Sequence, residues 1–362
     1  MDLVKTGLKQ RIARVASGSI MGLLAIAGTL AAPATARADA NDLESAFDRT
    51  LGTQPRAVQQ GFVMPAPAPQ VAQRAPTFAY SSNLEAQIAA LASPDMGRIG
   101  VAAVDLSSGR NVAVLGDQPF PMASTSKVAI AATFLDGVDQ GRWRLSDMYP
   151  LMVPLPSPKF AGAVAPVRAG DMLTAQSLIE LSLTRSDNQA TDALLAAVGG
   201  PQAVNRWLRR AGLAGIRIDR DIATLVRDDG AVDPATQIDM RDSATPLAMV
   251  RLLSGLYRGQ WLSSESRMVL LGAMSRCETG KHRIPALLPE GARALHKTGT
   301  LSNTASDIGI IEAPDGRAYA VAIYVTGQSN KASRDSRIAS LARAIYDGYQ
   351  TDGQGSRHTA SR

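Results

Sequence analysis

The sequence has 362 residues, of which 45% are hydrophobic and 19% are charged, with a formal net charge of +6. This length suits one large domain or two modest ones, and the composition is that of a globular protein with a sizeable core. Residues 1–38 hold five basic residues against one acidic residue, which leaves the remainder near +2. That field is weak, and no dense Lys/Arg stripe with interleaved aromatics occurs, so we expect no nucleic-acid partner.

The N-terminal segment has the three parts of a secretory signal peptide. Basic residues precede an apolar run over residues 20–32, and Ala36-Arg37-Ala38 follows as an A-x-A cleavage site. The run is short for a bilayer span, which favours cleavage over an uncleaved membrane anchor. We therefore expect a secreted or periplasmic protein with no stable membrane span after cleavage. Cys277 is the only cysteine, so an internal disulfide is excluded.

Composition also divides the rest of the chain. Residues 39–81 are rich in Pro, Ala and Gln, which predicts a linker that is semi-extended or disordered. A folded domain is expected over 82–349 and a flexible tail over 350–362. Hydrophobic spacing and turn residues predict its elements in chain order: helix 83–91, strands 98–106 and 111–115, helices 126–138, 173–183, 188–198, 201–211, 246–258 and 264–274, strands 292–298, 307–312 and 318–326, and helix 334–349.

Strands therefore occur at both ends of the domain, with helices between them. This order predicts an α+β fold, in which an antiparallel sheet built from both ends of the domain is flanked by helices as an α/β sandwich. The helices between the two groups of strands predict a second, mainly helical subdomain.

Lys127 stands one helical turn after Ser124 in an otherwise apolar segment. A buried ammonium group is costly unless it is paired or used in chemistry. If a helix begins near Ser124, the two side chains share a face, and Lys127 could take the serine proton once burial lowers its pKa. The S-x-x-K pair alone is weak evidence, since a helix-cap serine followed by an extended lysine has the same pattern.

Two further motifs strengthen this interpretation. Ser186-Asp187-Asn188 lies between two predicted helices, and Lys297-Thr298-Gly299 ends a predicted strand. With these three motifs in this order, residues 82–348 resemble the class A β-lactamases and the related penicillin-recognising serine hydrolases. Four more segments add to the resemblance: Phe120-Pro121-Met122, Ile218-Asp219-Arg220, Arg241–Met249 and His296–Thr300.

The resemblance implies a catalytic set of four residues. Ser124 would attack a lactam or peptide carbonyl, Lys127 would accept its proton, and Ser186 would pass a proton to the leaving nitrogen. Lys297 would complete the set and help to receive the substrate carboxylate. The implied substrate-binding residues are Asn188, Thr298, Gly299 and Thr300, and the backbone N–H groups of Ser124 and Thr300 would form the oxyanion hole.

The resemblance also implies an Ω-loop closed by an ion pair between Arg220 and Asp242, but one position in this loop departs from the family pattern. Ile222 stands where the family's lactamases carry the glutamate that activates the deacylating water, and Val226 replaces the asparagine that helps to hold this water. The loop looks longer than is usual in the family, and its acidic residues are Asp221, Asp228, Asp229, Asp233 and Asp239. One of them could supply the base, although the simpler interpretation is that they are solvated loop charges.

We therefore expect an exported active-site-serine hydrolase that forms acyl-enzymes with β-lactams or D-Ala-D-Ala-type peptides and hydrolyses them. Hydrolysis of β-lactams would be slow if Ile222 leaves the site without a base. One alternative is a D-alanyl-D-alanine carboxypeptidase acting on peptidoglycan, and another is a non-catalytic penicillin-binding or cell-wall sensor module. The expected partner is a β-lactam or a peptidoglycan stem peptide. We expect a monomer, no cofactor and no metal site.

Overall fold

A computed structural model of the chain describes residues 82–94 and 96–359, with side chains described through residue 351. The predicted signal peptide (1–38) and linker (39–81) lie outside the described residues. Among the described residues, no helix combines the length and apolarity needed to cross a membrane.

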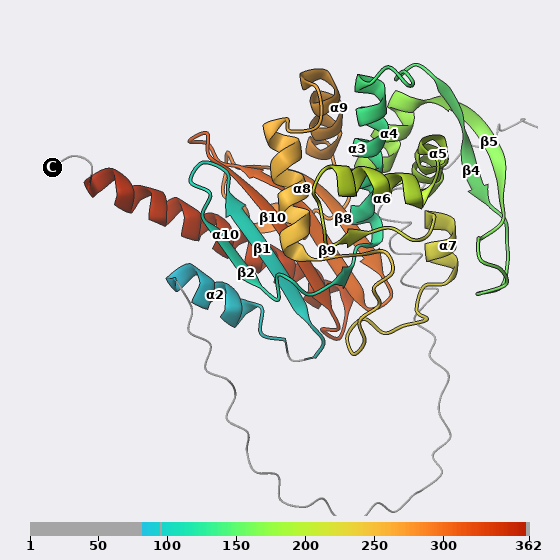
Figure 1. Cartoon of the computed structure of the whole chain (residues 1–362). Coiled ribbons are helices and arrows are strands. Elements are labelled where there is room, and N and C mark those ends of the chain that lie inside the picture. The colour runs from blue at the N-terminus through green and yellow to red at the C-terminus, as the bar shows by residue number, and fades with distance from the viewer. Residues whose placement is uncertain (1–81, 95, 360–362) are drawn as a thin grey trace, which may run out of the picture. The chain divides into compact units, whose positions relative to one another are not determined.

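A five-stranded antiparallel sheet forms the centre of the domain, in the order β2-β1-β10-β9-β8 (Figure 1). Its β1 pairs directly with β10, with Ile99 opposite Val325. The two ends of the domain therefore meet inside one sheet, which confirms the α+β fold predicted from the sequence. The strands are β1 (Ile99–Asp105), β2 (Asn111–Val114), β8 (Arg293–Leu301), β9 (Thr304–Glu312) and β10 (Ala318–Thr326).

Alternation along β10 shows how the sheet is covered on both faces. Val321 and Ile323 belong to a core shared with α2 (Asn83–Leu91) and α10 (Lys331–Thr359). Ala320, Ala322 and Tyr324 belong to the second core, which includes α8 (Pro246–Arg258). Because successive strand residues point to opposite faces, the apolar strand buries both of its sides.

The mainly helical part of the domain surrounds α3 (Ser126–Asp139), whose residues are buried from Ser126 through Leu135. Side-chain caps set the starts of several neighbouring helices. For example, Asp187 Oδ1 accepts the N–H of Ala190 at 2.8 Å at the start of α5. The other helices here are α4 (Ala175–Thr184), α5 (Asn188–Val198), α6 (Pro201–Arg210), α7 (Ile222–Arg227) and α9 (Ser264–Ser275), with the 3₁₀ turn η1 (Ala123–Thr125). A second 3₁₀ turn, η2 (Ile284–Leu287), packs against α10.

Two groups of short elements differ from the sequence prediction. A two-stranded ribbon of β4 (Met148–Pro154) and β5 (Val167–Thr174) lies at the edge of the helical part (Figure 1). Two prolines within β4, Pro150 and Pro154, and an irregular register near Pro150 obscure its strand pattern. Three two-residue strands form a small sheet in the order β3-β7-β6: β3 (Phe120–Pro121), β6 (Ile216–Arg217) and β7 (Ser243–Ala244).

The last helix also differs from the prediction, because α10 continues past Tyr349 to Thr359. The helix thus extends ten residues into the segment 350–362 that the sequence predicts as a flexible tail. Gly353 and Gly355 favoured an earlier end, but a glycine in a helix costs only about 1 kcal/mol, and no proline follows Tyr349 to stop the helix.

Candidate active site

Ser124 lies in the η1 turn immediately before α3. The preceding residue, Ala123, has a φ of 48°, in the left-handed region that a residue with a Cβ adopts at an energetic cost. Between Met122 and Leu135, Ser124 is the one residue that is not fully buried. The strained turn therefore presents a single hydroxyl at the edge of an otherwise buried segment.

Lys127 is fully buried, and its ammonium group donates to three acceptors. These are the Ser186 carbonyl at 2.5 Å, the Ser186 hydroxyl at 3.1 Å and Asn188 Oδ1 at 2.7 Å. Burial, reinforced by the positive charge of Lys297, holds the pKa of Lys127 well below its usual value, although Asp187 and Asp192 oppose this shift. The site thus favours a neutral amine more than water does.

Ser186 lies between two lysines. Its backbone has a φ of 59°, and its Oγ accepts hydrogen bonds from Lys127 at 3.1 Å and from Lys297 at 2.9 Å. Because the lone pairs of Oγ face the two ammonium groups, the hydroxyl proton is directed elsewhere. Such a group can give up a proton and have it replaced from either lysine. The structure thus brings together Lys127, Ser186, Asn188 and Lys297.

Gly299 explains how β8 comes close to the turn that carries Ser124. A Cβ at this position would lie 2.6 Å from the Met122 carbonyl oxygen and 2.4 Å from Ser306 Oγ, so only glycine fits. In the described sheet β8 pairs with β9 on one side only, and alternate N–H groups of such an edge strand point away from its partner. The close approach of β8 to the turn that carries Ser124, and the position of β8 at the edge of the sheet, suit the predicted role of the Thr300 N–H in the oxyanion hole.

Arg283 also lies at the site, although no sequence pattern marks it. Its side chain is fully buried, and its guanidinium donates to Thr300 Oγ1 at 2.8 Å and to the Gly299 carbonyl at 3.0 Å. Asp335 on α10 accepts from its Nε at 2.7 Å. Arg283 thus adds a second cation beside Lys297 behind the predicted carboxylate-binding residues. No local motif marks it, because its partners come from β8, β9 and α10.

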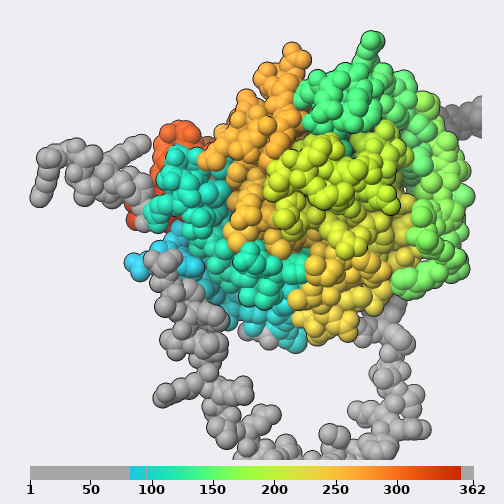
Figure 2. Space-filling view, in the orientation of Figure 1, coloured from blue at the N-terminus to red at the C-terminus, as the bar shows by residue number. Residues whose placement is uncertain are grey.

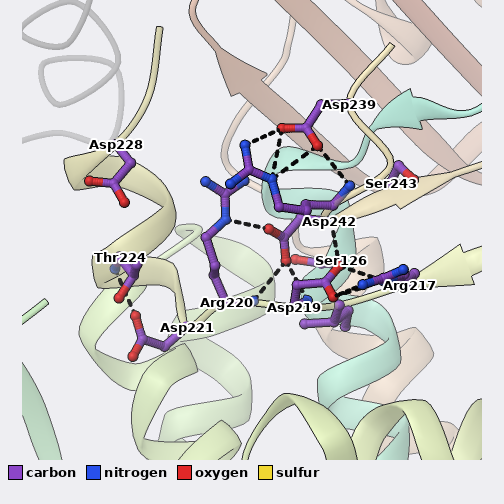
Figure 3. A network of polar contacts seen from close by, with 12 residues as sticks. Ser126, Arg217, Asp219, Arg220, Asp221, Thr224, Asp228, Asp239, Asp242 and Ser243 are labelled. Carbon is purple, nitrogen blue, oxygen red and sulfur yellow. Dashed lines mark hydrogen bonds and ion pairs between the residues drawn. The ribbon is translucent and has the colours of Figure 1, made fainter. Parts of the chain in front are cut away.

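Arg220 and Asp242 are also brought together, although they stand 22 positions apart in the sequence (Figure 3). Arg220 Nε lies 2.6 Å from Asp242 Oδ2, and the two side chains are 17% and 5% exposed. Asp242 Oδ1 also accepts the N–H groups of Asp219 and Arg220, at 2.8 and 3.0 Å. A carboxylate with three donors closes the base of the loop.

Ile222, where the resemblance places the missing glutamate, is the first residue of α7 and is 3% exposed. Its N–H and that of Ala223 donate to the two carboxylate oxygens of Asp192, at 2.7 and 2.8 Å. Burial raises the pKa of Asp192 to about 7, although both N–H groups and Lys127 act in the opposite direction. Asp192 stands one helical turn after Asn188, so the two share a helix face, but this spacing alone does not single out Asp192.

Asp228 and Asp229 belong to the enlarged part of the loop, and both are held in structural contacts. Asp228 pairs with Arg227 at 2.7 Å, and this hydrogen bond lowers its pKa to about 2, which makes it a weak base. Asp229 Oδ2 accepts the N–H of Ser302 at 2.8 Å, while Lys159 donates to the Asp229 carbonyl at 2.5 Å. Burial raises the pKa of Asp229.

The remaining loop acids are engaged as well. Asp221 caps α7 by accepting the Thr224 N–H at 2.7 Å. Asp233 accepts a hydrogen bond from Asn303 Nδ2 at 2.8 Å, and Asp239 pairs with Arg241 at 2.7 Å. These contacts fix the loop to its neighbours. In Figure 2 the loop is yellow and lies beside the green β4–β5 ribbon, whose connection it contacts through Lys159. Over residues 82–94 and 96–359, no three His, Cys, Asp or Glu side chains gather as a metal site would require.

Comparisons with known proteins agree with this geometry. The model of the "Beta-lactamase enzyme family" matches residues 83–349. β-Lactamase CTX-M-8 of Citrobacter amalonaticus is 32% identical over 280 residues, which cover 76% of this chain and 92% of the relative. β-Lactamase CTX-M-25 of Escherichia coli is 32% identical over 278 residues, which cover 76% of this chain and 92% of the relative.

Solved structures show the same similarity. An ancestral class A β-lactamase aligns with a TM-score of 0.63 and 36% identity, over 74% of this chain and 100% of that one. A β-lactamase from Chitinophaga pinensis aligns with a TM-score of 0.65 and 27% identity, over 74% of this chain and 100% of that one. The chain is a serine hydrolase that belongs to the class A β-lactamase family.

Proposed function

We propose that this enzyme is acylated by β-lactams at Ser124 and that it releases the product slowly, because its loop lacks the expected base. The observation that supports acylation is the Ser186 hydroxyl held between Lys127 and Lys297, together with a partly exposed Ser124 one helical turn before Lys127. The observation that supports slow release is the buried, hydrocarbon side chain of Ile222.

In the proposed acylation step, Lys127 acts as the base. A neutral lysine keeps two N–H donors and one lone pair, so Lys127 must give up one of its three present hydrogen bonds before its lone pair can accept the Ser124 proton. Ser124 Oγ then bonds to the lactam carbonyl carbon while N–H groups stabilise the developing oxyanion. Ser186 donates its proton to the departing nitrogen and regains one from Lys127, so the proton transfers balance.

We also propose that the cationic side of the site receives the substrate carboxylate. Lys297 supplies a positive charge, and Thr298 and Thr300 lie on the same strand with hydroxyl groups. Arg283, paired with Asp335, holds the Thr300 hydroxyl. Penicillins and peptide C-termini both carry a carboxylate, so this arrangement suits both substrate classes.

In the proposed deacylation step, water attacks the ester carbonyl of the acylated Ser124. Ile222 can neither hold nor deprotonate this water, and general-base assistance is typically worth about 10²–10⁴-fold in rate. A D-alanyl-D-alanine carboxypeptidase is the second candidate, because a peptidase of that kind does not require the missing glutamate. Export through residues 1–38 is part of the proposal and rests on the sequence pattern alone.

Intact mass spectrometry during incubation with benzylpenicillin tests the proposal. A Ser124-dependent adduct that persists for minutes would support it, and Ser124→Ala should show no adduct. An adduct that clears within seconds would overturn the slow step, and alanine variants of Asp228, Asp229 and Asp233 would then locate a base in the loop. Release of D-alanine from a stem peptide, with no hydrolysis of penicillin, would favour the carboxypeptidase. The absence of any adduct or product would overturn both functions.

A further inference from the structure

A second group of reactive side chains lies outside the proposed catalytic set. It consists of Cys277, in the segment after α9, His296 on β8 and Asp307 on β9. His296 Nδ1 lies 2.9 Å from both carboxylate oxygens of Asp307, and these two side chains are 5% and 0% exposed. Cys277, in contrast, is partly exposed. A partly exposed cysteine thus stands next to a buried imidazole–carboxylate pair.

The order of these groups is that of an activated nucleophile, its base and the group that orients the base. Nδ1 of His296 is used by Asp307, which leaves Nε2 for the hydrogen bond between the imidazole and the Cys277 sulfur. Burial lowers the pKa of His296, but the charge and hydrogen bond of Asp307 outweigh burial and raise it to about 10. The imidazole is therefore a cation at neutral pH.

The charged groups that face the sulfur both lie on β8. Burial raises the pKa of Cys277, but the hydrogen bond and charge of His296, the charge of Lys297 and the hydroxyl of Thr279 together lower it to about 7. Asp307 stands behind His296 and holds the positive charge in place. Near neutral pH a substantial share of Cys277 is therefore a thiolate paired with an imidazolium, the reactive form of a cysteine.

Two hydrogen bonds connect this thiol to the proposed substrate site. Cys277 Sγ lies 3.3 Å from Thr279 Oγ1, and Thr279 Oγ1 lies 2.6 Å from Thr298 Oγ1. Thr298 is one of the residues expected to receive the substrate carboxylate. A group attached to the sulfur would thus displace the segment whose Thr279 positions the Thr298 hydroxyl.

We propose that Cys277 is a modification site for low-molecular-weight disulfides, and that its modification reduces acylation at Ser124. The second half of this inference rests on the proposed function, whereas the first half does not. The Cys277 thiolate attacks one sulfur of the small disulfide, a new S–S bond forms, and the old S–S bond breaks to release one small thiolate. Cys277 is oxidised and the released sulfur is reduced, so the exchange needs no other reagent.

Oxidised glutathione is a suitable probe, and the rate of mixed-disulfide formation can be followed by intact mass spectrometry from pH 5 to 9. We expect a single adduct on the folded wild-type protein, with a half-maximal rate at about pH 7. Cys277→Ser should show no adduct. Ser124→Ala should form the mixed disulfide as the wild type does, which separates failure of this inference from failure of the proposed function.

His296→Asn provides a sharper comparison, because it removes the cation but keeps a polar side chain. The midpoint should move toward the ordinary thiol pKa of about 8.5, which would lower the thiolate fraction at pH 7 to about 3%. The lower nucleophilicity of a low-pKa thiolate partly offsets this change, so the loss of rate at pH 7 should be a few-fold. If His296→Asn does not fold, the wild-type pH profile alone still tests the site.

The effect on the proposed function is measured as the rate of acylation by benzylpenicillin before and after the disulfide is formed. We expect a slower rate after modification, recovery on reduction with dithiothreitol, and no sensitivity to the disulfide in Cys277→Ser. The inference is overturned if the folded protein forms no adduct, if the wild-type midpoint lies near pH 8.5, or if the modified protein is acylated at an unchanged rate.

Discussion

Lys127 and Lys297 share one acceptor, because both ammonium groups donate to the Ser186 hydroxyl, at 3.1 and 2.9 Å. Two cations around one hydroxyl repel each other, and this repulsion acts with burial to lower the pKa of Lys127. The residue proposed to bind the substrate carboxylate thus also helps to prepare the base. This dual role can be separated by experiment.

Lys297→Ala should raise the pKa of Lys127, since it removes a nearby positive charge. The neutral amine then forms only at higher pH, so the midpoint of the acylation rate against pH should move upward. The measurement is the maximal acylation rate at saturating benzylpenicillin, which separates this shift from weaker binding. Lys281→Ala, at an exposed position, is the matched control and should leave the midpoint in place.

Ile222→Glu should speed hydrolysis of the acyl-enzyme, because a carboxylate would occupy the position where relatives are expected to activate water. The gain should be smaller than the full acid–base factor, since Val226 leaves the water poorly held and a misplacement of about 1 Å can cost about 10²-fold. The double variant with Val226→Asn should exceed either single change. Decay of the penicillin adduct measures this, and equal decay in all four proteins would show that another group limits release.

Asp192 should make the stability of the fold depend on pH. Its folded pKa of about 7 lies above that of an unfolded aspartate, so its contribution is fully present below about pH 3.9 and is lost as the pH rises through 7. In this window the contribution falls by about 1.4 kcal/mol per pH unit. Asp192→Asn should remove this component of the slope in urea unfolding measured from pH 4 to 7. An unchanged slope would mean that Asp192 ionises normally.

Asp242→Asn should loosen the base of the loop, because it removes a largely buried charge and leaves Arg220 without its partner. Breaking such a pair costs about 3–5 kcal/mol, which should appear in the free energy of unfolding. Asp239→Asn is the matched control, since its partner Arg241 is 48% exposed and surface pairs contribute about 0–1 kcal/mol. Similar losses in the two variants would contradict the assigned role of Asp242.

Helices that begin at strong local signals could be predicted from the sequence nearly to the residue. Thr245 followed by Pro246 caps and starts α8, and Gly259 ends it in a left-handed conformation. Two of the three predicted motifs lie at helix starts, whereas Lys297-Thr298-Gly299 lies within β8. The β4–β5 ribbon was missed because none of its residues is fully buried and β4 contains two prolines, so neither alternation nor composition marks the strands.

Arg283 and Asp192 show why part of the site could not be predicted. Arg283 contacts β8, β9 and Asp335 on α10, so its role exists only after the two ends of the domain have met. Asp192 shares a helix face with Asn188, but the N–H groups that it binds belong to α7, which was not predicted as a helix. Contacts that join distant segments leave no pattern in either segment.

The enlarged loop restricts how this enzyme could be redesigned. Asp229 holds the turn after β8 through the Ser302 N–H, and the loop backbone at the same residue receives Lys159 from the β4–β5 connection. Replacing this loop alone would remove both attachments at once. A useful chimera would therefore have to exchange three segments together, the loop, the β4–β5 connection and the β8–β9 turn, because each is anchored on another.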